Sequence, residues 1–146
     1  MFRSSSSHTI DAKGRVIIPA RFRNILKADT LYGVMVTNKD DCLYAYPFSE
    51  WEKVEKKILK FTGPAMNTLR RFFLGKACEC MCDKQDRILI PPSLREYAGL
   101  KKDIVLVGNL ERFEIWDRER WESAEKRMEE ELKNQEVQGD IASLGL

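Results

Sequence analysis

The chain has 146 residues, of which 43% are hydrophobic and 33% are charged. This composition is sufficient for one packed domain, or two small ones sharing a core, and it excludes a wholly disordered chain. No apolar run approaches the roughly 20 residues of a membrane span. Met1-Phe2-Arg3 and the four serines that follow lack the apolar segment of a secretory signal. We therefore expect a cytoplasmic protein without membrane association, whose four cysteines are reduced.

The net charge of +2 conceals an uneven distribution. Residues 1–76 carry 14 Lys and Arg against 7 Asp and Glu, whereas residues 77–146 carry 11 against 16. A protein that binds polyanions through bulk charge would carry a larger overall excess. A polyanion site would thus be a local patch on the first half, with the acidic second half weakening non-specific binding.

In chain order, the first half begins with a predicted strand over Ser6–Ile10 and a tight turn at Asp11–Gly14. Gly14 supplies the left-handed conformation that such turns often need. The β-branched run Val16–Ile18 predicts a buried strand, and Pro19 suits the first position of a short helix. Further strands are predicted over Tyr32–Thr37 and Cys42–Tyr46.

Two helices complete the first half. Ser49 is the expected N-cap of one of them, and the other spans about Pro64–Leu74. The helix after Ser49 has an apolar stripe typical of a core or interface face. Its members are Trp51, Val54, Ile58 and Phe61.

The second half repeats this order. Asp11–Arg23 recurs as Asp83–Arg95, with five of 13 positions identical. The corresponding elements are strands at Ala77–Cys82, Ile88–Ile90, Ile104–Val107 and Phe113–Trp116, a turn at Asp83–Asp86, a short helix at Pro91, and a final helix capped by Asp117 with the stripe Trp121, Ala124, Met128 and Leu132. We predict an α+β fold with two intertwined units, over 1–76 and 77–135, and a loose tail at 136–146. Such small units bury too little alone, so mutual packing or oligomerisation is expected.

Three cysteines at alternate positions, Cys78, Cys80 and Cys82, share one face of the predicted strand. Their C-x-C-x-C spacing is unlike a zinc knuckle, and strand neighbours two residues apart make poor disulfides. We interpret them as packing residues, with adventitious binding of a soft metal as the alternative. No cofactor, metal or small-molecule substrate is predicted.

The sequence also argues against an enzyme. It contains no dinucleotide-binding glycine motif, Walker loop, nucleophile elbow or zinc-protease motif. The single histidine, His8, is expected to face solvent, and Glu129–Glu131 form a solvated run of like charge. Neither arrangement gives a catalytic pair.

The basic residues of the duplicated turns are the strongest candidates for function. Lys13 and Arg15 flank Gly14, with Arg21 and Arg23 close behind. Lys84 and Arg87 occupy the second turn, with Arg95 further along. Such side chains can bind phosphate, and arginine can also read guanine. In the other interpretation, Asp11 and Asp83 form ion pairs within their turns and shape the hairpins. The two interpretations are compatible.

These motifs resemble the MraZ family from Met1 to about Met128. The match comprises Asp11-Ala-Lys-Gly-Arg15 followed by Val16–Pro19, its repetition at Asp83–Pro91, Cys42–Pro47 before Trp51, Leu74–Cys80 and Leu106–Trp116. The resemblance implies tandem AbrB-like swapped-hairpin β-barrel units with flanking helices, assembled into a homo-oligomeric ring, an octamer or dodecamer.

The resemblance also implies a bacterial, nucleoid-associated DNA-binding regulator. It would act, as a repressor, on direct repeats in the promoter of the division and cell-wall gene cluster, including its own gene. The DNA contacts would map onto Lys13, Arg15, Arg21, Lys84 and Arg87, with Asp11, Gly14 and Asp83 shaping the turns.

The second turn departs from the family pattern at Gln85 and Asp86, where lysine and glycine are usual. Both changes remove positive charge, and we expect Asp86 to pair with Arg87 and draw it away from DNA. The alternative function is a ring-forming scaffold that binds another protein through its helical stripes without specific DNA binding.

Overall fold

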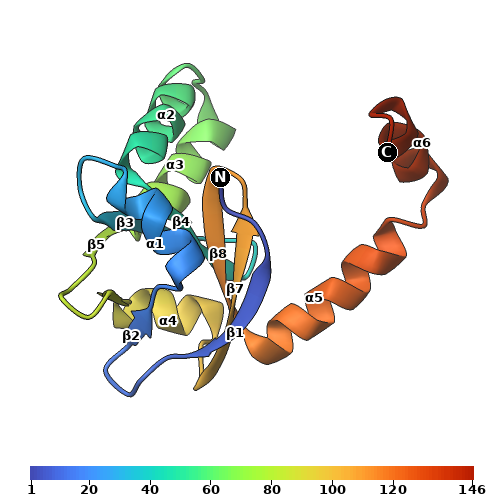
Figure 1. Cartoon of the computed structure of the whole chain (residues 1–146). Coiled ribbons are helices and arrows are strands. Elements are labelled where there is room, and N and C mark those ends of the chain that lie inside the picture. Colours follow the sequence, from blue (N-terminus) through green and yellow to red (C-terminus); the bar gives the residue numbers. More distant parts are fainter.

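The computed structural model describes residues 1–146 as eight strands and six helices (Figure 1). The strands are β1 (Ser5–Thr9), β2 (Arg15–Ile17), β3 (Gly33–Lys39), β4 (Cys42–Tyr46), β5 (Cys78–Met81), β6 (Arg87–Leu89), β7 (Asp103–Asn109) and β8 (Arg112–Asp117). The helices are α1 (Ala20–Lys27), α2 (Phe48–Leu59), α3 (Pro64–Gly75), α4 (Pro92–Ala98), α5 (Arg118–Glu131) and α6 (Gln135–Ser143). The predicted α+β class is confirmed.

Six strands form one antiparallel sheet in the order β1-β7-β8-β4-β3-β5. The first strand of each copy leaves its own half of the chain. Ser7 of β1 pairs with Val105 of β7, and Cys80 of β5 pairs with Val34 of β3. Both halves of the chain therefore contribute strands to one shared sheet.

Strands β2 and β6 pair antiparallel in a second, two-stranded sheet, here called the ribbon. The residue that follows each strand of the ribbon is hydrogen-bonded to the turn of the other copy. The Ile18 amide donates to the Asp86 carbonyl at 2.9 Å, and the Ile90 amide donates to the Gly14 carbonyl at 2.8 Å. The two turns are thus held by backbone hydrogen bonds that cross between the copies.

The main core forms where both copies meet. Phe22 of α1 stacks on Phe113 of β8 at 4.9 Å between ring centroids, and Phe2 meets both rings edge-on. All three are almost completely buried. Aromatic pairs in these geometries add stability beyond the area that they bury. One aromatic cluster therefore joins the N-terminal segment, the first copy and the second copy.

A second core lies beneath α2 and α3, where the ring of Trp51 stacks on that of Phe73. Both side chains are only 5% exposed. Trp51, from the predicted apolar stripe of α2, therefore packs into this core together with Phe73 of α3, and neither ring is free to contact another subunit. Phe61 and Phe72 remain exposed.

Several predicted details are wrong. Helix α2 begins one residue earlier than Ser49, after Pro47, and the Ser49 hydroxyl binds Asp29 instead of capping the helix. Pro19 precedes the first helical residue of α1. The expected loose tail contains α6, although none of its residues is buried. The cap at Asp117 is confirmed, because its carboxylate accepts from the Arg120 amide.

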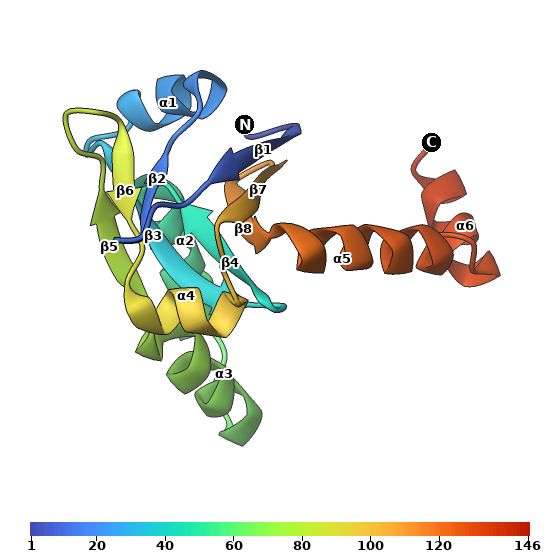
Figure 2. The same ribbon diagram turned by 90° about the horizontal axis from the view of Figure 1, so that it is seen from below.

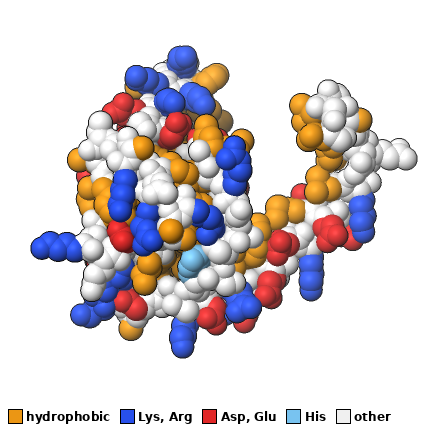
Figure 3. Space-filling model, in the orientation of Figure 1, with side chains coloured by type: hydrophobic (Ala, Val, Ile, Leu, Met, Phe, Trp, Pro, Cys, Tyr) orange, Lys and Arg blue, Asp and Glu red, His pale blue; other side chains and the backbone are white.

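Helix α5 extends away from the body of the molecule and carries α6 at its far end (Figure 2). We call these two helices the arm. Only its base is packed, through Ala124 and the partly buried Trp121, whereas Met128 and Leu132 are 40% and 48% exposed. Apolar side chains line the side of the arm that faces the body (Figure 3). None of the six helices combines the length and the apolar character of a membrane span.

Candidate nucleic-acid interface

The two duplicated turns have the same hydrogen-bonded frame. In the first, the Gly14 amide donates to the Asp11 carbonyl at 3.0 Å, and the Asp11 amide donates to the Arg15 carbonyl. In the second, the Asp86 amide donates to the Asp83 carbonyl, also at 3.0 Å. An aspartate opens each turn because its carboxylate can accept the amides that follow it. The sequence repeat is therefore also a structural repeat.

Each opening aspartate also binds the arginine that ends its turn. Arg15 Nε lies 2.6 Å from Asp11 Oδ2, and Arg87 Nε lies 2.9 Å from Asp83 Oδ2. The Arg15 amide and side chain, with burial opposing them, lower the pKa of Asp11 to about 2. Only Nε of either guanidinium is hydrogen-bonded, so the two terminal nitrogens of each have no protein acceptor. The predicted ion pairs exist, and they orient each arginine while leaving its terminal nitrogens without a partner.

The ribbon brings the two arginines onto one outward face. Arg15 is opposite Leu89 and Ile17 is opposite Arg87, while Val16 and Ile88 between them point into the core. Ile17 and Leu89 are 57% and 56% exposed. The predicted burial of these strands therefore holds for Val16 and Ile88 and is wrong for Ile17 and Leu89. A period of two places alternate residues outside, and this signal could have identified both aliphatic residues.

The left-handed position of each turn is filled differently. Gly14 has φ of 91° and Asp86 has φ of 62°. Glycine adopts such values at no steric cost, and aspartate tolerates them better than most residues. Asp86 binds Arg23 Nη1 at 3.1 Å and accepts from the Tyr32 hydroxyl at 2.6 Å. The expected pairing of Asp86 with Arg87 is therefore wrong, because Arg87 is held by Asp83.

The other predicted contact residues occupy two kinds of place. Lys13 and Lys84 are exposed at the turns, without an ion pair. Because the ribbon is antiparallel, the two turns lie at its opposite ends. Arg21 instead leans on the N-terminal segment, donating to the Arg3 and Ser4 carbonyls at 3.4 and 3.5 Å. Its guanidinium also covers the Phe22 ring at 4.2 Å.

Cys78 and Cys80 of β5, and Cys82 just after it, pack against the main core, with Cys80 buried and the other two half-buried. Burial raises the pKa of Cys80 to about 12 and that of Cys82 to about 11. No group of three or more His, Cys, Asp or Glu side chains is arranged to hold a metal ion. His8 is half-buried beside Ser6, with part of its side chain at the surface (Figure 3), and burial lowers its pKa.

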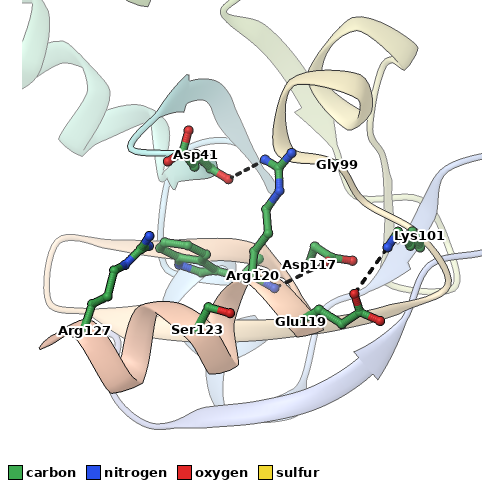
Figure 4. A pocket seen from close by; sticks show the side chains of 9 residues that line it. Asp41, Gly99, Lys101, Asp117, Glu119, Arg120, Ser123 and Arg127 are labelled. Atoms are coloured by element: carbon green, nitrogen blue, oxygen red, sulfur yellow. Dashed lines mark hydrogen bonds and ion pairs between the residues drawn. The ribbon is translucent and has the colours of Figure 1, made fainter. Parts of the chain in front are cut away.

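A polar hollow of about 580 Å³ lies between the β3–β4 turn, the end of α4 and α5 (Figure 4). Arg120 crosses it, and Nη1 donates to the carbonyls of Asp41 and Tyr97 at 3.2 and 3.0 Å. Lys101 reaches Glu119 at 3.5 Å on its rim. The polar groups of this hollow mainly bind one another and fasten α5 to the body.

The fold and site define a class: an internally duplicated α+β protein whose two arginine-bearing turns are joined by one antiparallel ribbon. The model of the family described as "MraZ protein, putative antitoxin-like" matches residues 1–72 and 73–140. The chain belongs to the MraZ family.

Three curated relatives named "Transcriptional regulator MraZ" match over their whole length. The protein of Desulforapulum autotrophicum is 61% identical over 146 residues, covering 100% of both chains. Those of Desulfosudis oleivorans and Acetivibrio thermocellus are 47% and 41% identical over 148 residues, again covering 100% of both. These names support a role in the regulation of transcription for this chain.

Proposed function

We propose that the protein binds duplex DNA through the outer face of the ribbon and the two turns at its ends. The observation that carries this proposal is the orientation of Arg15 and Arg87, each held through Nε with its two terminal nitrogens free. A guanidinium in this arrangement can bind a phosphate, or the O6 and N7 atoms of guanine. The major groove accommodates a two-stranded ribbon, so both arginines can engage one site.

The contact set has three parts. Arg15 and Arg87 reach bases or phosphates, while Lys13 and Lys84 at the turns contact phosphates as point charges. Arg21 contributes from α1, restrained by the N-terminal segment. Exposed Ile17 and Leu89 give the same face apolar surface that suits the methyl group of thymine.

Family membership supports the biological setting. We propose a nucleoid-associated repressor in the cytoplasm, acting on direct repeats in the promoter of the division and cell-wall gene cluster, its own gene included. The names of the relatives describe regulation, a role that needs no catalytic site and no small-molecule cofactor.

The arm supports assembly into a ring of AbrB-like swapped-hairpin units, an octamer or dodecamer. Its apolar face has no partner within the chain, and residues 77–146 are acidic whereas residues 1–76 are basic. Opposite charges on the two halves favour contact of one subunit's second half with the first half of the next. Such heterologous contacts close into a ring when the rotation permits. Repeated turns then bind successive DNA repeats at high effective concentration.

A gel-shift titration tests the proposal. The probe is the promoter fragment upstream of the protein's own gene, with one or several repeats, at rising salt. Arg15→Ala is expected to weaken binding by far more than one lost contact per subunit, and Lys13→Ala less severely. Lys57→Ala, which removes one exposed charge on α2, is the control. Normal binding by assembled Arg15→Ala would overturn the proposal, and leave a ring-forming scaffold as the alternative.

A further inference from the structure

The two turns correspond in the sequence repeat, but the residue at their left-handed position differs between them. Gly14 corresponds to Asp86, and Arg23 on α1 corresponds to Arg95 on α4. At the second turn, the Asp86 carboxylate lies against Arg23 and the Tyr32 hydroxyl. These contacts, and the nearby charges of Arg23 and Lys27, lower the pKa of Asp86 against the effect of burial. The chain thus supplies its own anion at this end of the ribbon.

No carboxylate meets the corresponding arginine at the first turn. The Arg95 guanidinium covers Gly14, where a Cβ atom would lie 2.8 Å from Arg95 Nε. That Nε is buried and has no hydrogen-bond partner, and no acidic side chain forms an ion pair with Arg95. The terminal nitrogens of the same guanidinium are neither buried nor hydrogen-bonded, so they can bind an anion from the pocket.

The unpartnered arginine borders a pocket of about 420 Å³ beside the first turn. Its lining includes the three cations Arg95, Lys101 and Lys102, and a single carboxylate, that of Asp11. Asp11 is already bound to Arg15 and to two backbone amides. The pocket therefore keeps a positive excess.

The second repeat supplies these cations, although the pocket lies at the turn of the first repeat. The Ile10 amide donates to the Lys102 carbonyl at 2.9 Å, which fastens the loop between α4 and β7 to the start of the turn. Lys102 forms no ion pair, and Lys101 has only its contact with exposed Glu119 on the rim of the neighbouring hollow (Figure 4). The backbone hydrogen bond of Lys102 thus keeps the loop close to Arg95, while the side-chain charge of Lys102 stays unpaired.

We propose that this pocket binds a phosphate group of the DNA backbone through Arg95, Lys101 and Lys102. This phosphate would lie next to the bases that Arg15 contacts. At the other end of the ribbon the Asp86 carboxylate occupies the equivalent place against Arg23, so only the first turn has room for a phosphate in this position. The proposal rests on the DNA binding proposed above. It adds contact residues from the opposite repeat and makes the two ends of the ribbon unequal.

The first experiment needs no DNA. Inorganic phosphate is titrated into the full-length protein while the Nε–H resonance of Arg95 is followed by NMR, with that of Arg118 on α5 as the control. We expect a saturable shift at Arg95, a smaller response at Arg118, and a several-fold weaker apparent affinity in Lys102→Gln. Equal responses at both arginines, or an unchanged affinity in Lys102→Gln, would overturn the site.

The second experiment measures the salt dependence of binding to a fragment with one repeat. Each lost phosphate contact reduces the slope of log K against log salt by about 0.9. Because the pocket binds one phosphate, we expect a reduction of roughly one such step for each bound subunit in Arg95→Gln/Lys102→Gln. Asp86→Gly opens the second site, and the slope should steepen by about one step. Its backbone conformation suits glycine, so this variant should fold.

The outcomes separate this proposal from the proposed function. A wild-type protein that binds no promoter fragment contradicts the function, while the phosphate titration still tests the pocket. Promoter binding with an unchanged slope in Arg95→Gln/Lys102→Gln overturns the DNA-backbone assignment alone. A pocket that binds free phosphate without any effect on the salt slope also overturns that assignment.

Discussion

The guanidinium of Arg120 lies directly over Gly99, where a Cβ atom would come within 2.6 Å of Nη2. Gly99 also ends α4 in the left-handed conformation, with φ of 61°. Two independent constraints thus require glycine at this position: the backbone conformation and the side chain that crosses it. Since Arg120 binds carbonyls of the β3–β4 turn and of α4, this contact connects three elements at the base of the arm.

Gly99→Ala should therefore lower the free energy of unfolding by more than the roughly 1–2 kcal/mol of a left-handed alanine. In an Arg120→Ala background the same substitution should cost only the backbone part, because the side chain in the way is gone. Urea denaturation of the four proteins measures the difference. Equal costs in both backgrounds would mean that Arg120 moves aside freely.

Phe22→Ala should lower the free energy of unfolding by about 3–5 kcal/mol, because it leaves a cavity between two other aromatic rings. Phe22→Leu is the matched control, since the second copy has Leu94 at this position and buries it completely. The leucine variant should lose less stability than the alanine variant. If the two variants lost the same amount in denaturant titration, the three-ring cluster would not be the stabilising feature.

Asp11→Asn should change how stability depends on pH. The pKa of Asp11 is about 2 in the folded protein, below its usual value of 3.8, so the unfolded chain binds more protons between these values. The contribution of Asp11 is complete above about pH 4 and is lost as the pH falls towards 2. Thermal melts across this range should show a shallower acid decline in Asp11→Asn. An identical slope in both proteins would contradict the ion pair with Arg15.

Met128→Glu/Leu132→Glu should reduce the size of the assembly, because the substitutions place charge on the exposed apolar face of the arm. Lys126→Glu, in the same helix, tests whether added negative charge alone has this effect. Light scattering at micromolar concentration gives the mass. A wild-type protein with the mass of a single chain would rule out the ring.

Cys78→Ser and Cys82→Ser should each lower stability modestly and leave DNA binding unchanged, since both thiols pack against the core. The raised pKa of Cys82 keeps this thiol protonated and poorly reactive at neutral pH. A stoichiometric metal in the purified protein, lost together with DNA binding on chelation, would contradict this interpretation.

Local patterns predicted much of the fold. The strand Cys42–Tyr46 has the predicted ends, and Asp117 caps α5 as predicted. Both features depend on residues that are neighbours in the sequence, so a local pattern is enough to predict them. Interactions between distant residues account for the errors. Ser49 was expected as a cap, but Asp29 binds its hydroxyl from another part of the chain.

The candidate site shows the same division. The turn frame around Asp11 and Asp83 follows from residues within five positions of each other, so the sequence predicted its ion pairs. Asp86 finds its partners in Arg23 and Tyr32, far away in the sequence, and no local rule selects them over the adjacent Arg87. The relation of Arg95 to Gly14 likewise arises only when the two copies interlock.

The crossed pairing of the strands also determines when the protein can fold during synthesis. Strand β1 pairs only with β7, and β2 pairs only with β6, so neither has its partner while the first half alone has left the ribosome. At about 5–20 residues per second this wait lasts several seconds. The serine-rich sequence of β1 lowers the risk of aggregation while the strand is unpaired, because a polar strand is a poor template for pairing with other chains.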